Sequence, residues 1–159
     1  MAVNFDKYLE FVKDKFEPVN QDRGKLTTAG CIIAQQIDEI DLALQGILSY
    51  DIVDDIGDAL FATAYIASVE NLDFKKMVIE AEKKHVVANI DRLKATAIGV
   101  ISACAQYANY TLRKNVSPDK LFRRHEHTLF VFLIQLAPFL KQEGKRLEDA
   151  IEKNIEKLS

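Results

Sequence analysis

Apolar residues recur at intervals of three and four along most of the 159-residue chain, and no long stretch alternates apolar with polar residues. This spacing places apolar side chains on one face of an α-helix, whereas a half-buried strand would alternate. Only six glycines and three prolines interrupt the pattern. We therefore predict an all-α protein, a helical bundle folded as a single domain over residues 1–159. The clearest apolar stripe consists of Ile33, Ile37, Ile40, Leu44 and Ile47.

Capping and helix-breaking residues divide the chain into seven expected helices. Asn4 is a favourable cap for a first helix, which we expect Pro18 to end, so that residues 1–24 form a helix and a loop. Asp73 and the pair Ser117-Pro118 are further helix-start signals. The later helices are expected at about Leu26–Leu48, Asp51–Asn71, Asp73–Arg92, Thr96–Arg113, Ser117–Gln142 and Leu147–Leu158.

The two halves of the chain resemble each other weakly. Residues 28–32 and 101–105 have similar sequences, and the order of long, long and shorter helix occurs twice. We predict two pseudo-repeats of three helices, at 25–92 and 93–159, of which the second is degenerate. The alternative is that one apolar periodicity makes both halves of any helical bundle look alike.

The composition argues against several classes of partner. The 21 basic and 24 acidic residues give a net charge of −3, which disfavours bulk electrostatic binding to nucleic acid or an anionic membrane. No apolar run approaches the roughly 18–20 residues that span a bilayer. The first residues do not resemble a signal peptide, and we expect Cys31 and Cys104 to be reduced and buried, so we predict a cytoplasmic location.

Two polar pairs on successive helices are the candidate functional residues. Gln36 and Glu39 lie three residues apart, as do Asp55 and Asp58, so each pair shares one side of its helix. With Ile40 as the direction of the core, Gln36 lies roughly 40° and Glu39 roughly 100° to one side. Both side chains therefore border the buried face.

The face that carries the acids of the next helix becomes apolar within one turn after Asp58, with Ala62, Tyr65 and Val69. This change suggests that the acids face a cleft. Carboxylates clustered in such a place repel one another unless a cation neutralises them, and Mg²⁺ or Mn²⁺ suits all-oxygen ligands. The alternative is a solvated acidic helix start, which the helix dipole favours.

The two clusters, Gln35-Gln36-Ile37-Asp38-Glu39 and Asp54-Asp55-Ile56-Gly57-Asp58-Ala59-Leu60-Phe61, resemble the paired motif of the all-α nucleoside triphosphate pyrophosphohydrolases. That superfamily includes MazG, the dimeric dUTPases and phosphoribosyl-ATP pyrophosphohydrolase. Its pattern is ExxE on one helix and ExxD on the next. The present chain departs from it in having Gln36 for the first acid and the shorter Asp55 for a glutamate.

The resemblance implies a MazG-like bundle and a Mg²⁺- or Mn²⁺-dependent nucleotide pyrophosphohydrolase, which converts a (d)NTP to a (d)NMP and pyrophosphate. It assigns metal binding to Gln36, Glu39, Asp55 and Asp58, with Glu39 also as the catalytic base. A family element of the form Lys-x-x-x-Asn-x-x-Arg is similar to residues 85–92, with His85 in place of the lysine. It implies that Asn89 and Arg92, with the neighbouring Lys84, bind the substrate phosphates.

Two other functions stay open. The chain could be a degenerate MazG-like module that binds nucleotides or proteins without catalysis, because Gln36 is an uncharged ligand. It could also be an unrelated helical bundle with an acidic surface. Whether it forms a homo-oligomer is open as well. His125 and His127 lie two residues apart on a helix, which is poor geometry for zinc, and no P-loop or GxSxG motif is present.

Overall fold

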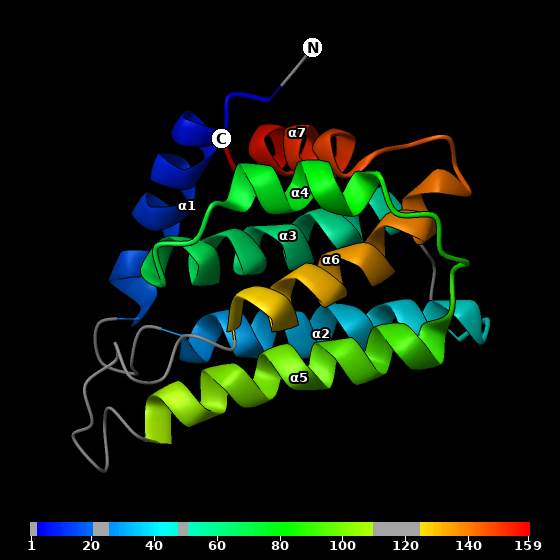
Figure 1. Ribbon diagram of the computed structural model, residues 1–159, viewed down its shortest axis with the longest axis horizontal. Coiled ribbons are helices and arrows are strands. Elements are labelled where there is room, and N and C mark those ends of the chain that lie inside the picture. Colours follow the sequence, from blue (N-terminus) through cyan, green and yellow to red (C-terminus); the bar gives the residue numbers. More distant parts are fainter. Residues whose placement is uncertain (1–2, 21–25, 48–50, 110–124) are drawn as a thin grey trace.

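The computed structural model describes residues 3–20, 26–47, 51–109 and 125–159, and this part of the chain is helical without strands, as predicted (Figure 1). The three longest helices, α2, α3 and α5, contain 18 or 19 residues each. The helices are α1 (Phe5–Asn20), α2 (Thr27–Leu44), α3 (Ile52–Val69), α4 (Phe74–Glu82), α5 (Ile90–Ala108), α6 (His125–Lys141) and α7 (Leu147–Leu158).

Side-chain caps fix the starts of α1, α3, α4 and α5, and at α1 the predicted cap Asn4 accepts from the backbone N–H of Lys7. Asp51, Asp73 and Asn89 each precede a helix, and each side chain accepts a hydrogen bond from the backbone N–H three residues later. Such a bond satisfies one of the backbone donors that a helix start leaves without an intrahelical partner. The cap at Asn89 also shows that one expectation was wrong.

We expected a single helix over Asp73–Arg92. The structure instead has two helices there: α4 ends at Glu82, an extended connection follows, and α5 begins at Ile90. No glycine or proline marks this break. The Lys141 ammonium of α6 donates to the backbone oxygens of Glu82 and Lys84, at 3.2 and 3.1 Å. A tertiary contact therefore satisfies carbonyl groups at the end of α4, and local propensity could not reveal it.

The other helix boundaries differ less. Helix α1 continues past Pro18 to Asn20, contrary to expectation. The start of α2 at Thr27 and the bounds of α3 lie within two residues of those expected, and those of α7 are as predicted. Helix α2 ends at Leu44, before the expected Leu48, and α5 begins at Ile90, before the expected Thr96. The expected boundaries at Arg113 and Ser117 lie outside the described residues.

Helix α3 is the centre of the bundle. It packs against α1, α2, α6 and α7, and more weakly against α4. Every residue from Ala59 to Ala67 is buried, which explains why the sequence of this stretch is apolar on all sides. All seven helices contribute side chains to one hydrophobic core.

The third helix of each predicted pseudo-repeat packs against the other half of the chain. Helix α4 lies on α6, and α7 lies on α3 (Figure 1). The chain therefore brings its last helix back to the acidic start of α3. The internal repeat itself stays a prediction.

The two cysteines are both unpaired. Cys104 is buried as expected, but Cys31 is exposed, in a groove between α2 and α5. None of the described helices is long and apolar enough to cross a membrane.

Candidate functional site

Helix α2 carries Gln36 on its buried face and Glu39 one turn later at the edge of that face. Gln36 is only 7% exposed, and none of the described residues donates a hydrogen bond to its Oε1 atom. Glu39 is half-buried and accepts a hydrogen bond of 3.3 Å from the exposed Gln35. The placement inferred from helix geometry is therefore confirmed for these two residues. A buried oxygen that accepts no hydrogen bond destabilises the folded protein. A group that bound the Gln36 oxygen would remove this cost.

Helix α3 begins with the cap Asp51 and carries Asp54 and Asp55 in its first turn and Asp58 in its second. Burial raises the pKa of Asp55 to about 6, and the negative charges of Glu39, Asp54, Asp58 and Asp51 add to this effect. Glu39 belongs to α2, which packs against α3. No cationic side chain in the described ranges pairs with Asp55, in contrast to its neighbours on α3.

Helix α7 supplies the groups that neutralise those neighbours. The Lys157 ammonium lies 2.7 and 3.0 Å from the two carboxylate oxygens of Asp58 and 3.0 Å from Oδ1 of Asp54. The amide of Asn154 donates to Oδ1 of Asp58 over 2.9 Å.

The sequence analysis did not identify Asn154 and Lys157 as site residues. The available signal was Asn154, a polar residue on the apolar stripe of an amphipathic helix, where it is 2% exposed. The stripe itself consists of Leu147, Ala150, Ile151, Asn154 and Leu158.

Gly57 determines how closely α7 approaches α3. A Cβ atom at this position would lie 2.8 Å from the backbone oxygen of Ala150, a distance that real Cβ contacts essentially never show. The absence of a side chain therefore lets the two helices pack tightly, and it brings Asn154 within reach of Asp58.

The residues expected to bind phosphates, Lys84, Asn89 and Arg92, lie at the start of α5 and in the connection before it. Asn89 caps α5 by accepting from the backbone N–H of Arg92 over 3.0 Å, and both side chains are exposed. Lys84 is exposed in the connection between α4 and α5. None of the hydrogen bonds formed by the described residues joins these three to the carboxylates of α3, so their role in substrate binding stays a prediction.

The α2–α3 cluster consists of Gln36, Glu39, Asp55 and Asp58. Its oxygen ligands are of the type that a hard divalent cation prefers, but not all four are free to bind one. Within the described ranges, no three side chains of the Asp, Glu, His and Cys types are placed to hold a metal ion. Gln36, Glu39 and Asp55 each offer a side-chain oxygen, the type of ligand that Mg²⁺ or Mn²⁺ prefers, and among the described residues the Gln36 oxygen has no hydrogen-bond partner. Asp58, the fourth expected ligand, is already bound by Lys157 and Asn154.

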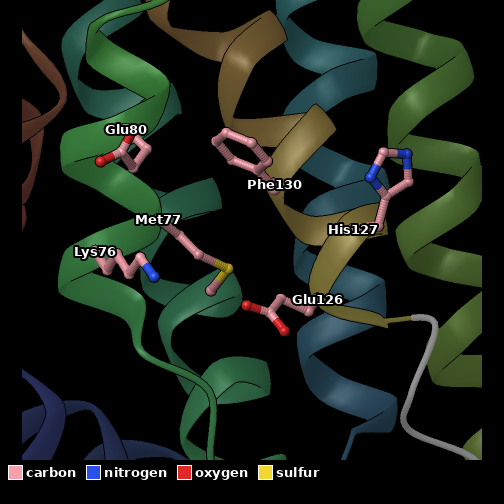
Figure 2. Close-up of a pocket in the computed structure, with 6 residues that line it drawn as sticks. All are labelled: Lys76, Met77, Glu80, Glu126, His127 and Phe130. Atoms are coloured by element: carbon pink, nitrogen blue, oxygen red, sulfur yellow. The ribbon is translucent and has the colours of Figure 1, made fainter.

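His125 and His127 lie in different environments, as their spacing predicted. His125 is buried and its Nδ1 atom forms a hydrogen bond with the buried Glu70, whose pKa is raised by burial. His127 is exposed and lines a groove of about 310 Å³ between α4 and α6, beside Met77 and Phe130 (Figure 2).

No protein-family model matches the chain, and no curated protein and no solved structure shows significant similarity to it.

Proposed function

We propose that the chain is a Mg²⁺-dependent nucleoside triphosphate pyrophosphohydrolase whose site lies between α2, the start of α3 and α7. The observation that carries this proposal is the cluster around Asp55. Its carboxyl is partly buried beside Glu39 and lacks a cationic partner among the described residues, and the buried Gln36 oxygen also lacks a donor. Excess negative charge and an unsatisfied oxygen at one place favour a divalent cation.

Gln36, Glu39 and Asp55 would hold the metal ion, and Asp58 would complete the set in the family pattern. When bound, Mg²⁺ neutralises phosphate charge and lowers the pKa of an attacking water. Mn²⁺ could take its place, because it also prefers oxygen ligands.

Lys157 and Asn154 are the cationic and amide donors that bind Asp58. Both groups can donate to phosphate oxygens, so α7 would orient the triphosphate. Glu39 would accept the proton of the water that attacks phosphorus. The bond between the α and β phosphates breaks, and the products are a nucleoside monophosphate and pyrophosphate.

The test is pyrophosphate release from a panel of NTPs and dNTPs, with and without Mg²⁺ or Mn²⁺. We expect metal-dependent release by the wild type and its loss in Asp55→Asn. Asp91→Asn is the matched control, because Asp91 is an exposed acid in the first turn of α5. No release from any nucleotide, together with no metal-induced thermal shift, would contradict the proposal.

A second candidate is a nucleotide-binding module without catalysis. Two observations favour it: Gln36 is an uncharged ligand, and Lys157 already neutralises Asp58. Thermal stabilisation by nucleotides without pyrophosphate release would support this function over the first. The absence of any nucleotide effect would instead indicate an unrelated helical bundle.

A further inference from the structure

The Lys157 ammonium of α7 lies among the carboxylates of α3 in the way that a bound cation would. Its nitrogen is 2.7 and 3.0 Å from the two oxygens of Asp58 and 3.0 Å from Oδ1 of Asp54. An ammonium has three N–H donors, and three carboxylate oxygens lie within hydrogen-bond distance of this one. In this arrangement Lys157 therefore has no donor left for a phosphate.

Asp58 cannot bind Lys157 and a divalent cation at the same time. It is one of the four expected metal ligands, and a metal ion on its oxygens would lie very close to the ammonium. Two cations at such a separation repel each other. The Asp58 side chain is only 22% exposed, so water screens this repulsion incompletely. The ammonium, which is tethered to α7, and a metal ion therefore compete for one carboxylate.

The two donors on α7 differ in how readily they can leave Asp58. The Lys157 side chain is 39% exposed, and its flexible four-carbon stem can turn toward solvent while α7 stays packed on α3. Asn154 is only 2% exposed, and its amide donates to Asp58 over 2.9 Å. The amide can thus keep the carboxylate oriented when the ammonium moves away.

A buried group on α2 indicates a ligand independently of these charges. The Gln36 side chain is 7% exposed, and its Oε1 atom accepts no hydrogen bond from the described residues. Gln36 precedes Glu39 by one turn, and their helix packs against α3. A cation bound between α2 and α3 would give this oxygen a partner. Lys157 does not, because its donors are directed to Asp54 and Asp58.

We propose that Lys157 is a built-in counter-ion that closes the metal site and exchanges its carboxylate partners for phosphate when a metal-bound nucleotide arrives. The ammonium leaves Asp58 when a divalent cation binds there, and it then donates to phosphate oxygens. This inference rests on the proposed function, since it assigns a regulation to the same site. It implies that Lys157 weakens the binding of free metal and strengthens the binding of phosphate.

Two binding constants of the whole chain test the exchange. The first is the Kd of Mn²⁺ without nucleotide, measured from the electron paramagnetic resonance of the free ion, because Mn²⁺ prefers oxygen ligands as Mg²⁺ does. The second is the Kd of inorganic pyrophosphate, the expected product, measured calorimetrically at saturating Mn²⁺. Lys157→Met removes the charge, whereas Lys157→Arg keeps it.

The matched control is Lys153→Met. Lys153 lies one turn before Lys157 on α7, its side chain is similarly exposed at 42%, and its ammonium lies 2.6 Å from Asp51. Asp51 is the cap of α3 and is not among the expected metal ligands. The control therefore removes the same charge from the same helix without freeing a ligand.

We expect Lys157→Met to bind Mn²⁺ about tenfold more tightly, because Asp58 is no longer occupied in most molecules. The same variant should bind pyrophosphate about tenfold more weakly, because a charged donor to phosphate is lost. Lys157→Arg and Lys153→Met should bind Mn²⁺ as the wild type does. Circular dichroism would verify that each variant is folded.

An unchanged Mn²⁺ Kd in folded Lys157→Met, or an equal gain in Lys153→Met, would overturn the exchange, as would tighter pyrophosphate binding by Lys157→Met. Release of pyrophosphate from nucleotides is scored separately. Release by the wild type with a Mn²⁺ Kd that does not depend on Lys157 would support catalysis and overturn the exchange. Opposite changes of the two constants without release from any nucleotide would support the exchange and contradict catalysis.

Discussion

The Lys157 ammonium lies 2.7 Å from Oδ1 of Asp58, although the two residues are 99 positions apart in the chain. The same ammonium lies 3.0 Å from Asp54, so one cation serves two carboxylates. Helix α7 thereby neutralises one side of the acidic start of α3. Asp55, on the side toward α2, receives no such partner among the described residues and has a raised pKa.

Replacing Lys157 by Met should lower the free energy of unfolding by about 1 kcal/mol. The loss is modest because these groups are partly exposed and water screens them, but two carboxylates would then repel without a counter-ion. Urea unfolding measures the change. Lys145→Met is the control, since Lys145 is exposed between α6 and α7, and a similar loss there would show that the Lys157 contacts contribute nothing specific.

Gly57→Ala should destabilise the protein by about 1–3 kcal/mol, because the new methyl group would clash with the backbone of α7. In Gly99→Ala the nearest atom is a side-chain methyl of Thr128 at 3.3 Å, so the gain in helix propensity should offset the small adjustment required. Thermal unfolding of both variants provides the comparison. Equal melting temperatures would argue against the close α3–α7 contact.

The stability of the protein should depend on pH through Asp55. Its pKa is raised to about 6 in the folded state, so folding favours its protonated form. The stabilising contribution is therefore complete below about pH 4 and is lost as the pH rises through 6. We expect a loss of about 1 kcal/mol, a value reduced for solvent screening at this half-exposed group.

In Asp55→Asn this part of the pH dependence should disappear. Urea unfolding between pH 4 and 7, in the absence of divalent cations, measures it for both proteins. Asp14→Asn is the control, because Asp14 is exposed on α1. Parallel curves for the wild type and Asp55→Asn would show that Asp55 does not titrate in this range.

Gln36→Glu should lower stability by about 2 kcal/mol without metal, because it places a charge at a position that is 7% exposed, one turn from Glu39. Added Mg²⁺ should raise the melting temperature of this variant more than that of the wild type. The control is Gln106→Glu. Because Gln106 is exposed, this substitution should neither lower stability nor change the response to Mg²⁺. A Mg²⁺ response equal to that of the wild type would count against Gln36 as a metal ligand.

The buried pair of Glu70 and His125 should behave as a coupled unit. His125→Leu leaves the buried Glu70 carboxylate without its partner and should cost about 3–5 kcal/mol, whereas the double variant with Glu70→Leu should recover much of this loss. A double-mutant cycle by urea unfolding measures the coupling. The control is the exposed ion pair of Lys83 and Glu80, whose removal should change stability by less than about 1 kcal/mol. A coupling energy that is equally small for the buried pair would contradict this prediction.

Much of the fold was predictable because its signals are local. Apolar spacing and caps located α2, α3 and α7, and helix geometry correctly placed Gln36 on a buried face with Glu39 at its edge. The break between Glu82 and Ile90 was missed because a lysine on α6 satisfies carbonyl groups at the end of α4. A contact of that kind has no trace in the local sequence.

The sequence by itself determined the positions of α2, α3 and α7, the buried placement of Gln36 and the two pairs of candidate ligands, since each depends on the spacing of neighbouring residues. Only the tertiary structure decided which groups meet those ligands. It packs α7 against Gly57 and brings Asn154 and Lys157 to Asp58, while Asp55 is left beside Glu39. The physical reason is that the charge around a carboxylate depends on the helices packed against it, and side-chain spacing within one helix does not specify that packing.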